Sequence, residues 1–173
     1  MSDLGMTRRS FLGTSALAGT ALTIIPRSVL AAPGRPGAND RINHAIIGVG
    51  GMGNAHIGYV LKDPQAKLVA VCDVRKSRRD AAVQRAGADC HAYLDFREML
   101  DRESIDVVHV VTPPHWHALQ NIAALNAGCD VWAEKPMTRT IAEGTHVADA
   151  VRRNGRVFRL NTWFRLYGSF YGL

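Results

Sequence analysis

The glycine pattern G-x-G-x-x-G at Gly48, Gly50 and Gly53 follows directly after an apolar run at residues 45–47. In a strand–turn–helix unit, the first glycine makes the tight turn, the second lets a pyrophosphate approach the backbone, and the third lets helix and strand pack closely. The N-terminus of the helix then offers free N–H groups and the positive end of its dipole to phosphate. An ordinary glycine-rich turn is the alternative. The pattern predicts cofactor contacts from Gly48, Gly50, Gly51, Met52 and Gly53.

An acidic residue stands where a ribose-binding carboxylate is expected. Asp73 ends a second apolar run at residues 68–72 and lies 73 − 53 = 20 positions beyond the last glycine of the pattern. Its carboxylate can accept both hydroxyls of the adenosine ribose, and its charge would repel a 2′-phosphate, which favours NAD over NADP. Arg75 opens a basic segment at residues 75–79, however, and an arginine there can accommodate that phosphate. The sequence therefore predicts NAD as the cofactor and leaves NADP possible, and a solvated helix face is the alternative for the basic segment.

Polar groups also follow the apolar run at residues 105–111. Thr112 and Pro113 come first, and His117 falls near the start of the next predicted helix. A metal site at His115 and His117 is a poor interpretation, because positions i and i+2 of a helix diverge and no third ligand is apparent. We predict no metal site.

The predicted strand at residues 131–133 is followed by Glu134, Lys135 and Pro136. A lysine at the carboxyl end of a strand, beside a glutamate and fixed by a proline, could point its ammonium group at a substrate hydroxyl or carbonyl. Such a lysine can donate a proton or stabilise a developing alkoxide. An exposed lysine with no catalytic role is the alternative, and the residue types alone leave it open.

Strands and helices must alternate to position these groups. The patterns predict strands at 44–49, 67–72, 91–92, 105–111, 131–133 and 156–160, and helices at 51–61, 75–86, 95–100, 115–127 and 140–154. Capping boxes begin the helices after Asp95 and Thr140, and Gly87 suits a helix end. This alternation is typical of an α/β fold with a Rossmann-type, doubly wound parallel sheet.

Together these motifs resemble the nucleotide domain of the Gfo/Idh/MocA oxidoreductase family across about residues 42–162. The resemblance rests on the glycine pattern, the strand end at Asp73, Thr112-Pro113 with His117, and Glu134-Lys135-Pro136, in this order and spacing. It implies that Lys135 is catalytic and lies near the nicotinamide and the substrate. It also implies that four residues border the cofactor: Thr112, Pro113, His117 and Glu134.

The resemblance implies a function as well as a fold. The first expectation is an NAD(P)-dependent oxidoreductase that acts on a sugar, polyol or glycoside by hydride transfer. The second is an NAD-dependent glycosidase, which oxidises its substrate transiently. The third is a dinucleotide-binding fragment without catalysis. The resemblance also implies a second α/β domain that supplies most of the substrate pocket and the oligomer contacts, and we expect this chain to lack it.

Composition agrees with a globular domain and argues against several partners. Of the 173 residues, 47% are hydrophobic and 21% are charged, which is ordinary for a folded protein. The net charge of +6 is modest, and the motifs of nucleic-acid-binding proteins are absent, so no nucleic-acid partner is expected. The cysteines, Cys72, Cys90 and Cys129, form no C-x-x-C pair and suit isolated small side chains.

The N-terminal segment has the features of an export signal. Arg8 and Arg9 precede Phe11 and Leu12, a mildly apolar stretch follows, and small residues end the segment at Ala31. The paired arginines resemble a twin-arginine signal, so the export machinery is an expected partner and the location is periplasmic or otherwise outside the cytoplasm. The apolar stretch is short for a membrane span, and no stable anchor is expected.

The expected domain organisation has four parts. They are a twin-arginine signal peptide at 1–31, a linker at 32–41, an NAD(P)-binding Rossmann domain at 42–162, and a truncated start of the C-terminal domain at 163–173. A fragment of this kind is expected to bind dinucleotide but to be inactive alone, and to form the family's homo-oligomer only at full length.

Overall fold

The structure is a computed structural model, and it describes residues 40–162 and residue 165. Six strands form one sheet: β1 (Ile42–Ile47), β2 (Ala66–Cys72), β3 (His91–Tyr93), β4 (Val107–Val110), β5 (Asp130–Glu134) and β6 (Phe158–Asn161). Five helices alternate with them: α2 (Gly51–Lys62), α3 (Lys76–Ala86), α4 (Phe96–Arg102), α5 (Pro114–Asn126) and α6 (Ile141–Asn154).

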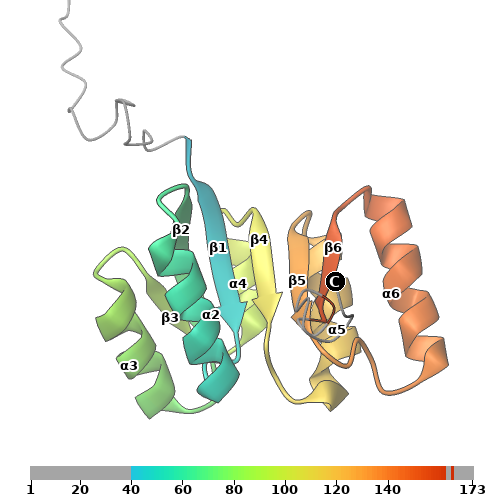
Figure 1. The fold of residues 1–173 in the computed structure, drawn as a ribbon, viewed down its shortest axis with the longest axis horizontal. Coiled ribbons are helices and arrows are strands. Elements are labelled where there is room, and N and C mark those ends of the chain that lie inside the picture. Colours follow the sequence, from blue (N-terminus) through green and yellow to red (C-terminus); the bar gives the residue numbers. More distant parts are fainter. Residues whose placement is uncertain (1–39, 163–164, 166–173) are drawn as a thin grey trace, which may run out of the picture.

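All neighbouring strands of the sheet are parallel, and their order is β3-β2-β1-β4-β5-β6. The chain first winds outward from β1 to β3, crosses over to β4, and then winds outward in the other direction (Figure 1). In such sheets, ligands bind beyond the carboxyl ends of the strands, at the point where the order reverses. That point lies between β1 and β4, so the predicted doubly wound fold is confirmed.

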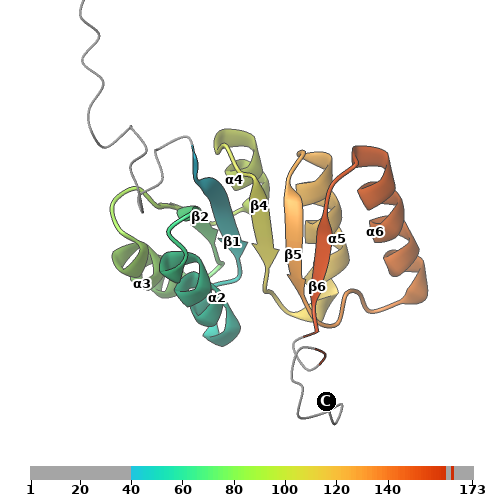
Figure 2. The same ribbon diagram turned by 45° about the horizontal axis from the view of Figure 1, so that its top comes forward.

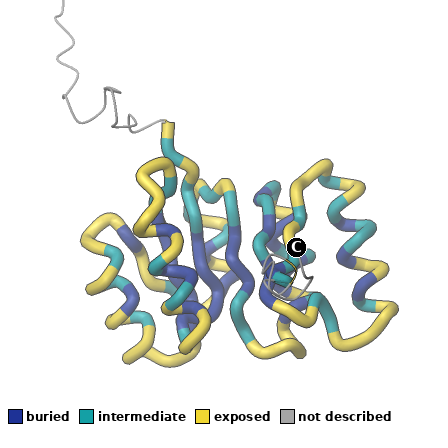
Figure 3. The backbone as a smooth tube through the Cα atoms, in the orientation of Figure 1, coloured by how far each residue is buried: buried dark blue, intermediate teal, exposed yellow. Residues whose placement is uncertain are grey.

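Helices cover both faces of the sheet. α2 and α3 pack on one face, whereas α4 and α5 lie on the opposite face with α6 beside α5 (Figures 1 and 2). The central strands are buried on both sides, as Figure 3 shows, and Ala45, Ile46 and Val108 have no exposed surface. This burial on both faces explains why the sequences of the central strands are nearly continuous runs of apolar residues.

Local signals placed several element ends correctly. Thr140 and Glu143 form the complete predicted capping box of α6, with each side chain bonded to the other residue's backbone N–H. The capping box predicted at Asp95 is wrong in detail, because Asp95 accepts from the N–H of Arg97 and no reciprocal bond from Glu98 is formed. The first strand ends at Ile47, two residues earlier than predicted, since Gly48 turns the chain with a φ of +90°.

The predicted signal peptide at 1–31, nearly all of the linker at 32–41 and most of the segment 163–173 lie outside the described residues. Those parts of the domain organisation stay predictions. Within the described part of the chain, no helix combines the length and hydrophobicity that crossing a bilayer requires.

Candidate functional site

The turn between β1 and α2 tolerates no side chain at two of its glycines. A Cβ atom at Gly48 would lie 2.8 Å from the carbonyl oxygen of Val111, and Gly48 also has a φ of +90°. A Cβ atom at Gly53 would lie 2.0 Å from the carbonyl oxygen of Gly48. Both glycines are therefore required for the close packing of β1, β4 and α2.

The middle glycine has a different role. Gly50 has an ordinary φ of −71°, and an added Cβ atom would meet only the guanidinium of Arg78, at 3.3 Å. At Gly51 an added Cβ atom would meet nothing within 4 Å. The space in front of these two glycines is open, as the approach of a diphosphate requires.

The N-terminus of α2 is free to bind an anion. No side chain caps it, and its first turn contains no acidic residue. The first amides of a helix have no partner within the helix, so the N–H groups of Gly51, Met52 and Gly53 remain available. The residues present fit the diphosphate of a dinucleotide.

Asp73 joins the end of β2 to this turn. Its Oδ2 atom accepts the backbone N–H of Val49 at 3.0 Å, and its Oδ1 atom accepts the N–H of Arg75 at 2.9 Å. The Nη1 atom of Arg78 lies 3.8 Å from Oδ2. The carboxylate is nearly buried, yet it lines the same cleft as the glycines. It is thus fixed in orientation and placed beside the phosphate-binding turn.

The cleft has a volume of about 560 Å³ and lies at the crossover between β1 and β4. Six residues predicted to bind the cofactor line it: Gly48, Gly50, Gly51, Asp73, Thr112 and Pro113. Its other polar lining comes from Arg78, Asp95, Arg97, Trp116 and Gln120, which were not predicted as site residues. Only Arg78 had a sequence signal, because it belongs to the basic segment after Asp73. Arg75 contributes its backbone N–H to Asp73, and its side chain is not part of the lining.

His117 connects the two strand ends that carry the other predicted residues. Its Nε2 atom lies 2.7 Å from the carbonyl oxygen of Thr112, and its Nδ1 atom lies 2.6 Å from that of Pro136. The ring is completely buried. Both partners are carbonyl oxygens, so each bond has the ring nitrogen that faces it as its donor. His117 therefore supports the cofactor cleft from behind.

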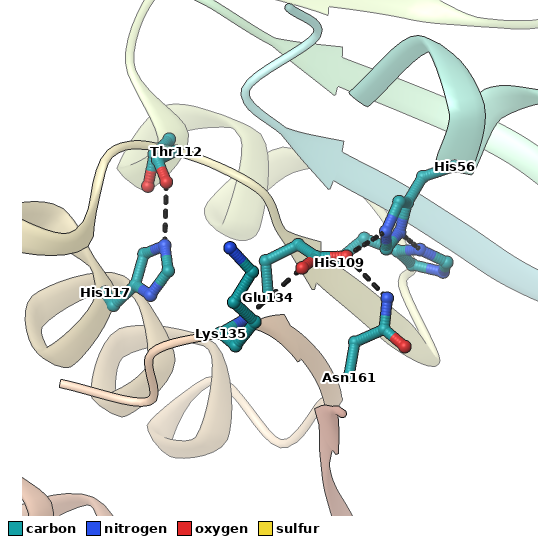
Figure 4. A network of polar contacts seen from close by, with 7 residues as sticks. All are labelled: His56, His109, Thr112, His117, Glu134, Lys135 and Asn161. Atoms are coloured by element: carbon teal, nitrogen blue, oxygen red, sulfur yellow. Dashed lines mark hydrogen bonds and ion pairs between the residues drawn. The ribbon is translucent and has the colours of Figure 1, made fainter. Parts of the chain in front are cut away.

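Glu134 is held by three donors at the carboxyl end of β5 (Figure 4). The Nε2 atom of His56 lies 3.0 Å and the Nδ2 atom of Asn161 lies 2.5 Å from its Oε1 atom. The backbone N atom of Lys135 lies 3.3 Å from Oε2. Burial raises the pKa of Glu134, but the hydrogen bonds from Asn161 and His56 outweigh it and hold the pKa below its ordinary value of 4.5. Glu134 is thus a buried carboxylate rather than a surface acid.

Lys135 is exposed at the end of β5, and in the view of Figure 4 its side chain stands between His117 and Glu134. An exposed amine beside a buried, hydrogen-bonded framework is free to meet a ligand in front of the sheet. The sequence singled out Glu134 and Lys135 but missed His56 and Asn161. A histidine within the predicted helix at 51–61, three residues after Gly53, was the available signal for His56.

A six-stranded parallel sheet in this order, with a glycine turn and a strand-end acid at its crossover, defines a Rossmann-type dinucleotide-binding domain. The family model "Oxidoreductase family, NAD-binding Rossmann fold" matches residues 42–162. The chain belongs to this family, Gfo/Idh/MocA, and its described domain is an NAD-binding domain.

Relatives of known name agree with this assignment. D-glucoside 3-dehydrogenase of Escherichia coli (strain K12) is 35% identical over 65% of this chain and 32% of its own length. Glycosyl hydrolase family 109 protein 2 of Shewanella sp. (strain ANA-3) is 29% identical over 88% of this chain and 38% of its own length. The crystal structure of scyllo-inositol dehydrogenase from Lactobacillus casei with bound cofactor NAD(H) and scyllo-inositol has a TM-score of 0.70 at 30% identity, over 76% of this chain and 39% of that one. The chain spans about a third of the length of the curated relatives it matches.

Proposed function

We propose that this protein is an NAD-dependent oxidoreductase that transfers hydride to or from a ring carbon of a sugar, polyol or glycoside. The observation that carries the proposal is the shared cleft in which the open glycine turn and the fixed Asp73 carboxylate lie together. The substrate class is supported by the names of the relatives, which include a D-glucoside dehydrogenase and a scyllo-inositol dehydrogenase.

In this proposal each part of the site has one task. Bound NAD supplies a carbon that accepts or returns a hydride. The amides at the start of α2 bind the diphosphate, and Asp73 accepts hydroxyl hydrogens of the adenosine ribose. As the neutral amine, Lys135 takes the proton of the substrate hydroxyl onto its Nζ atom during oxidation, and as the ammonium it returns that proton during reduction. Thr112, Pro113, His117 and Glu134 keep the strand ends around the cofactor in place.

A glycosidase that uses transient oxidation is the second candidate. It is favoured by the glycosyl hydrolase family 109 relative, whose alignment covers more of this chain than that of the D-glucoside dehydrogenase. In that reaction the substrate is oxidised, eliminates its leaving group, adds water and is reduced again, so NAD is regenerated in each cycle. A chain that binds NAD without catalysis is the third candidate.

One experiment separates the three. The purified protein is incubated with NAD⁺ and either a free polyol such as inositol or an aryl glucoside, and both NADH absorbance and released phenol are measured. Net NADH formation that is lost in Lys135→Met supports the oxidoreductase. Phenol release without net NADH supports the glycosidase, and NAD binding with neither product supports the binding fragment.

We also propose that the protein is exported by the twin-arginine route, from the sequence Thr7-Arg8-Arg9-Ser10-Phe11-Leu12. Expression with this segment intact is expected to place the protein outside the cytoplasm, and the double change Arg8→Lys with Arg9→Lys is expected to retain it inside. Equal export of both forms would contradict the proposal.

A further inference from the structure

Glu134 is the inner end of a chain of hydrogen bonds that runs through three histidines. His56 Nε2 lies 3.0 Å from Glu134 Oε1, and His56 Nδ1 lies 2.9 Å from His109 Nδ1. His109 Nε2 in turn lies 2.8 Å from His44 Nδ1. The four side chains come from β5, α2, β4 and β1, so the chain crosses the sheet from its carboxyl end toward the half-buried His44 (Figure 4 shows the inner three).

The middle of this chain of hydrogen bonds is enclosed by the protein. His56 and His109 have no exposed surface, and the Trp132 ring packs against both, with ring centres 5.3 Å and 4.9 Å away. Tyr59 contacts His56 from one turn further along α2, and the guanidinium of Arg159 lies over Trp132. Water has no place between the links, so any hydrogen that moves along the chain must pass from ring to ring.

Burial and neighbouring groups shift the pKa values of the outer and the middle histidine, His44 and His109. Burial lowers the pKa of His44, while Asp63 and Asp106 oppose that shift. Burial, together with the neighbouring His44 and His56, lowers the pKa of His109 to about 2. This lowered pKa favours the neutral His109 ring, which carries one hydrogen, on either Nδ1 or Nε2.

The position of that hydrogen sets the direction of every link. With the hydrogen on Nδ1, His109 donates to His56 and accepts from His44, so all bonds point inward to an ionised Glu134. With the hydrogen on Nε2, His109 donates to His44 and accepts from His56, so the bonds point outward. The outward arrangement holds one more proton, which lies between His56 Nε2 and Glu134 Oε1.

We propose that Glu134, His56, His109 and His44 form a proton relay, in which a proton taken up between Glu134 and His56 reverses the hydrogen positions on His109 and His44. One proton entering at His44 Nε2 shifts three ring hydrogens inward by one link each and protonates Glu134. The reverse shifts release one proton from His44 Nε2. If the proposed oxidoreductase function holds, the inward shifts bring a proton to Glu134, the chain neighbour of Lys135, where the reduction of a carbonyl consumes one.

The substitution Glu134→Gln provides the test because it fixes the direction in which the hydrogen bonds of the relay point. The new amide must offer its oxygen to the N–H of Lys135, since its NH₂ group there would face another donor. Its NH₂ group then donates to His56 Nε2, and Asn161 can turn its own amide oxygen toward it. The variant therefore imposes the outward arrangement without changing the size of the side chain.

Ring-nitrogen NMR spectra of the full 173-residue chain, labelled with ¹⁵N-histidine, report which nitrogen of each ring carries the hydrogen. At about pH 8, where ordinary histidines are neutral, we expect the hydrogen on Nδ1 of His109 and His44 in the wild type and on Nε2 of both in Glu134→Gln. In the double variant Glu134→Gln with His109→Phe, His44 should no longer differ from His44 in the single variant His109→Phe. Glu143→Gln, which removes an equal charge from the cap of α6, is the matched control and should leave His109 unchanged.

The same hydrogen positions on His109 and His44 in the wild type and in Glu134→Gln would overturn the relay, whatever the effect on NAD binding. Circular dichroism of each variant verifies that it is folded, and a pH titration of the wild type gives the same answer without any substitution. In that titration, the hydrogen of each ring, His109 and His44, should move between Nδ1 and Nε2 with one shared midpoint pH. Separate midpoint pH values would overturn the proposal. NADH affinity, measured on the same samples, tests the proposed function separately.

Discussion

The backbone N–H of Val49 donates to the Oδ2 atom of Asp73 across 3.0 Å, and this bond ties the glycine turn after β1 to the end of β2. The side chain that is expected to recognise the ribose therefore also braces the turn that is expected to bind the diphosphate. Any change at Asp73 acts on both, and its effect on cofactor selectivity must be separated from its effect on the turn.

Asp73→Asn keeps an acceptor for one backbone N–H but removes the charge. We expect NADH affinity to fall about 10- to 100-fold, which corresponds to about 1–3 kcal/mol for a lost polar contact. NADPH affinity should fall less, because the repulsion of a 2′-phosphate is removed as well. Fluorescence titration with both nucleotides measures the ratio, and an unchanged ratio would mean that Asp73 serves only the turn.

Arg78→Ala tests the opposite selectivity. The Arg78 guanidinium lines the cleft, 3.8 Å from the Oδ2 atom of Asp73, beside the expected position of a 2′-phosphate. NADPH affinity should fall several-fold, by about 1 kcal/mol for a partly exposed ion pair, while NADH affinity stays within about twofold. Arg75→Ala, whose side chain lies outside the cleft lining, is the control, and an equal effect of both changes would contradict the assignment.

Gly50→Ala should abolish tight NADH binding without unfolding the domain. The added methyl group meets only the flexible end of Arg78, and Gly50 has a φ that alanine adopts without strain. The methyl group would stand where the diphosphate must approach the backbone. Gly58→Ala, on the same helix and near only the end of Arg85, is the matched control and should keep both stability and affinity. Equal affinity of the two variants would argue against the turn as the phosphate site.

Acid should destabilise the protein through His109. Its pKa is about 2 in the folded protein and 6.5 ordinarily, so only the unfolded state takes up this proton between those values. The stabilisation is complete above about pH 6.5 and is lost at up to about 1.4 kcal/mol per pH unit as the pH falls toward 2. In His109→Asn, urea unfolding between about pH 6.5 and about pH 5 should show a shallower slope, and an equal slope would contradict the burial of a neutral ring.

His117→Gln should loosen the two strand ends beside the cleft. A glutamine side chain cannot place polar atoms against two carbonyl oxygens in the directions that the imidazole reaches, so the contact with Thr112 or the contact with Pro136 is lost. We expect the free energy of unfolding to fall by about 1–3 kcal/mol, and NADH affinity to fall with it. Thermal unfolding and NADH titration measure the two effects, and a variant as stable as the wild type would show that His117 is replaceable.

Much of this site could be predicted because its signals are local in the sequence. The glycine pattern, the spacing to Asp73 and the proline-marked strand ends each depend on a few neighbouring residues. Their meeting at one cleft follows from the parallel sheet, which brings the carboxyl ends of β1, β2 and β4 together. The alternation of strands and helices was likewise predicted from apolar runs and helix caps.

The unpredicted parts depend on contacts between distant elements. The His56–Glu134 bond joins residues 78 positions apart, and no periodic pattern relates α2 to the end of β5. Likewise, His109 lies inside a β-branched run that predicts only a buried strand. The roles of Arg97 and Trp116 in the cleft also required the positions of α4 and α5, which local patterns do not give.

The most direct test of the account is a backbone-amide NMR titration of the full chain with NAD⁺. The account predicts that the largest shift changes fall on the amides of Gly50, Gly51, Met52 and Gly53, with a second group at Asp73 and its neighbours. Saturating changes elsewhere, with these amides unmoved, would contradict a diphosphate at the start of α2 and the function proposed from it.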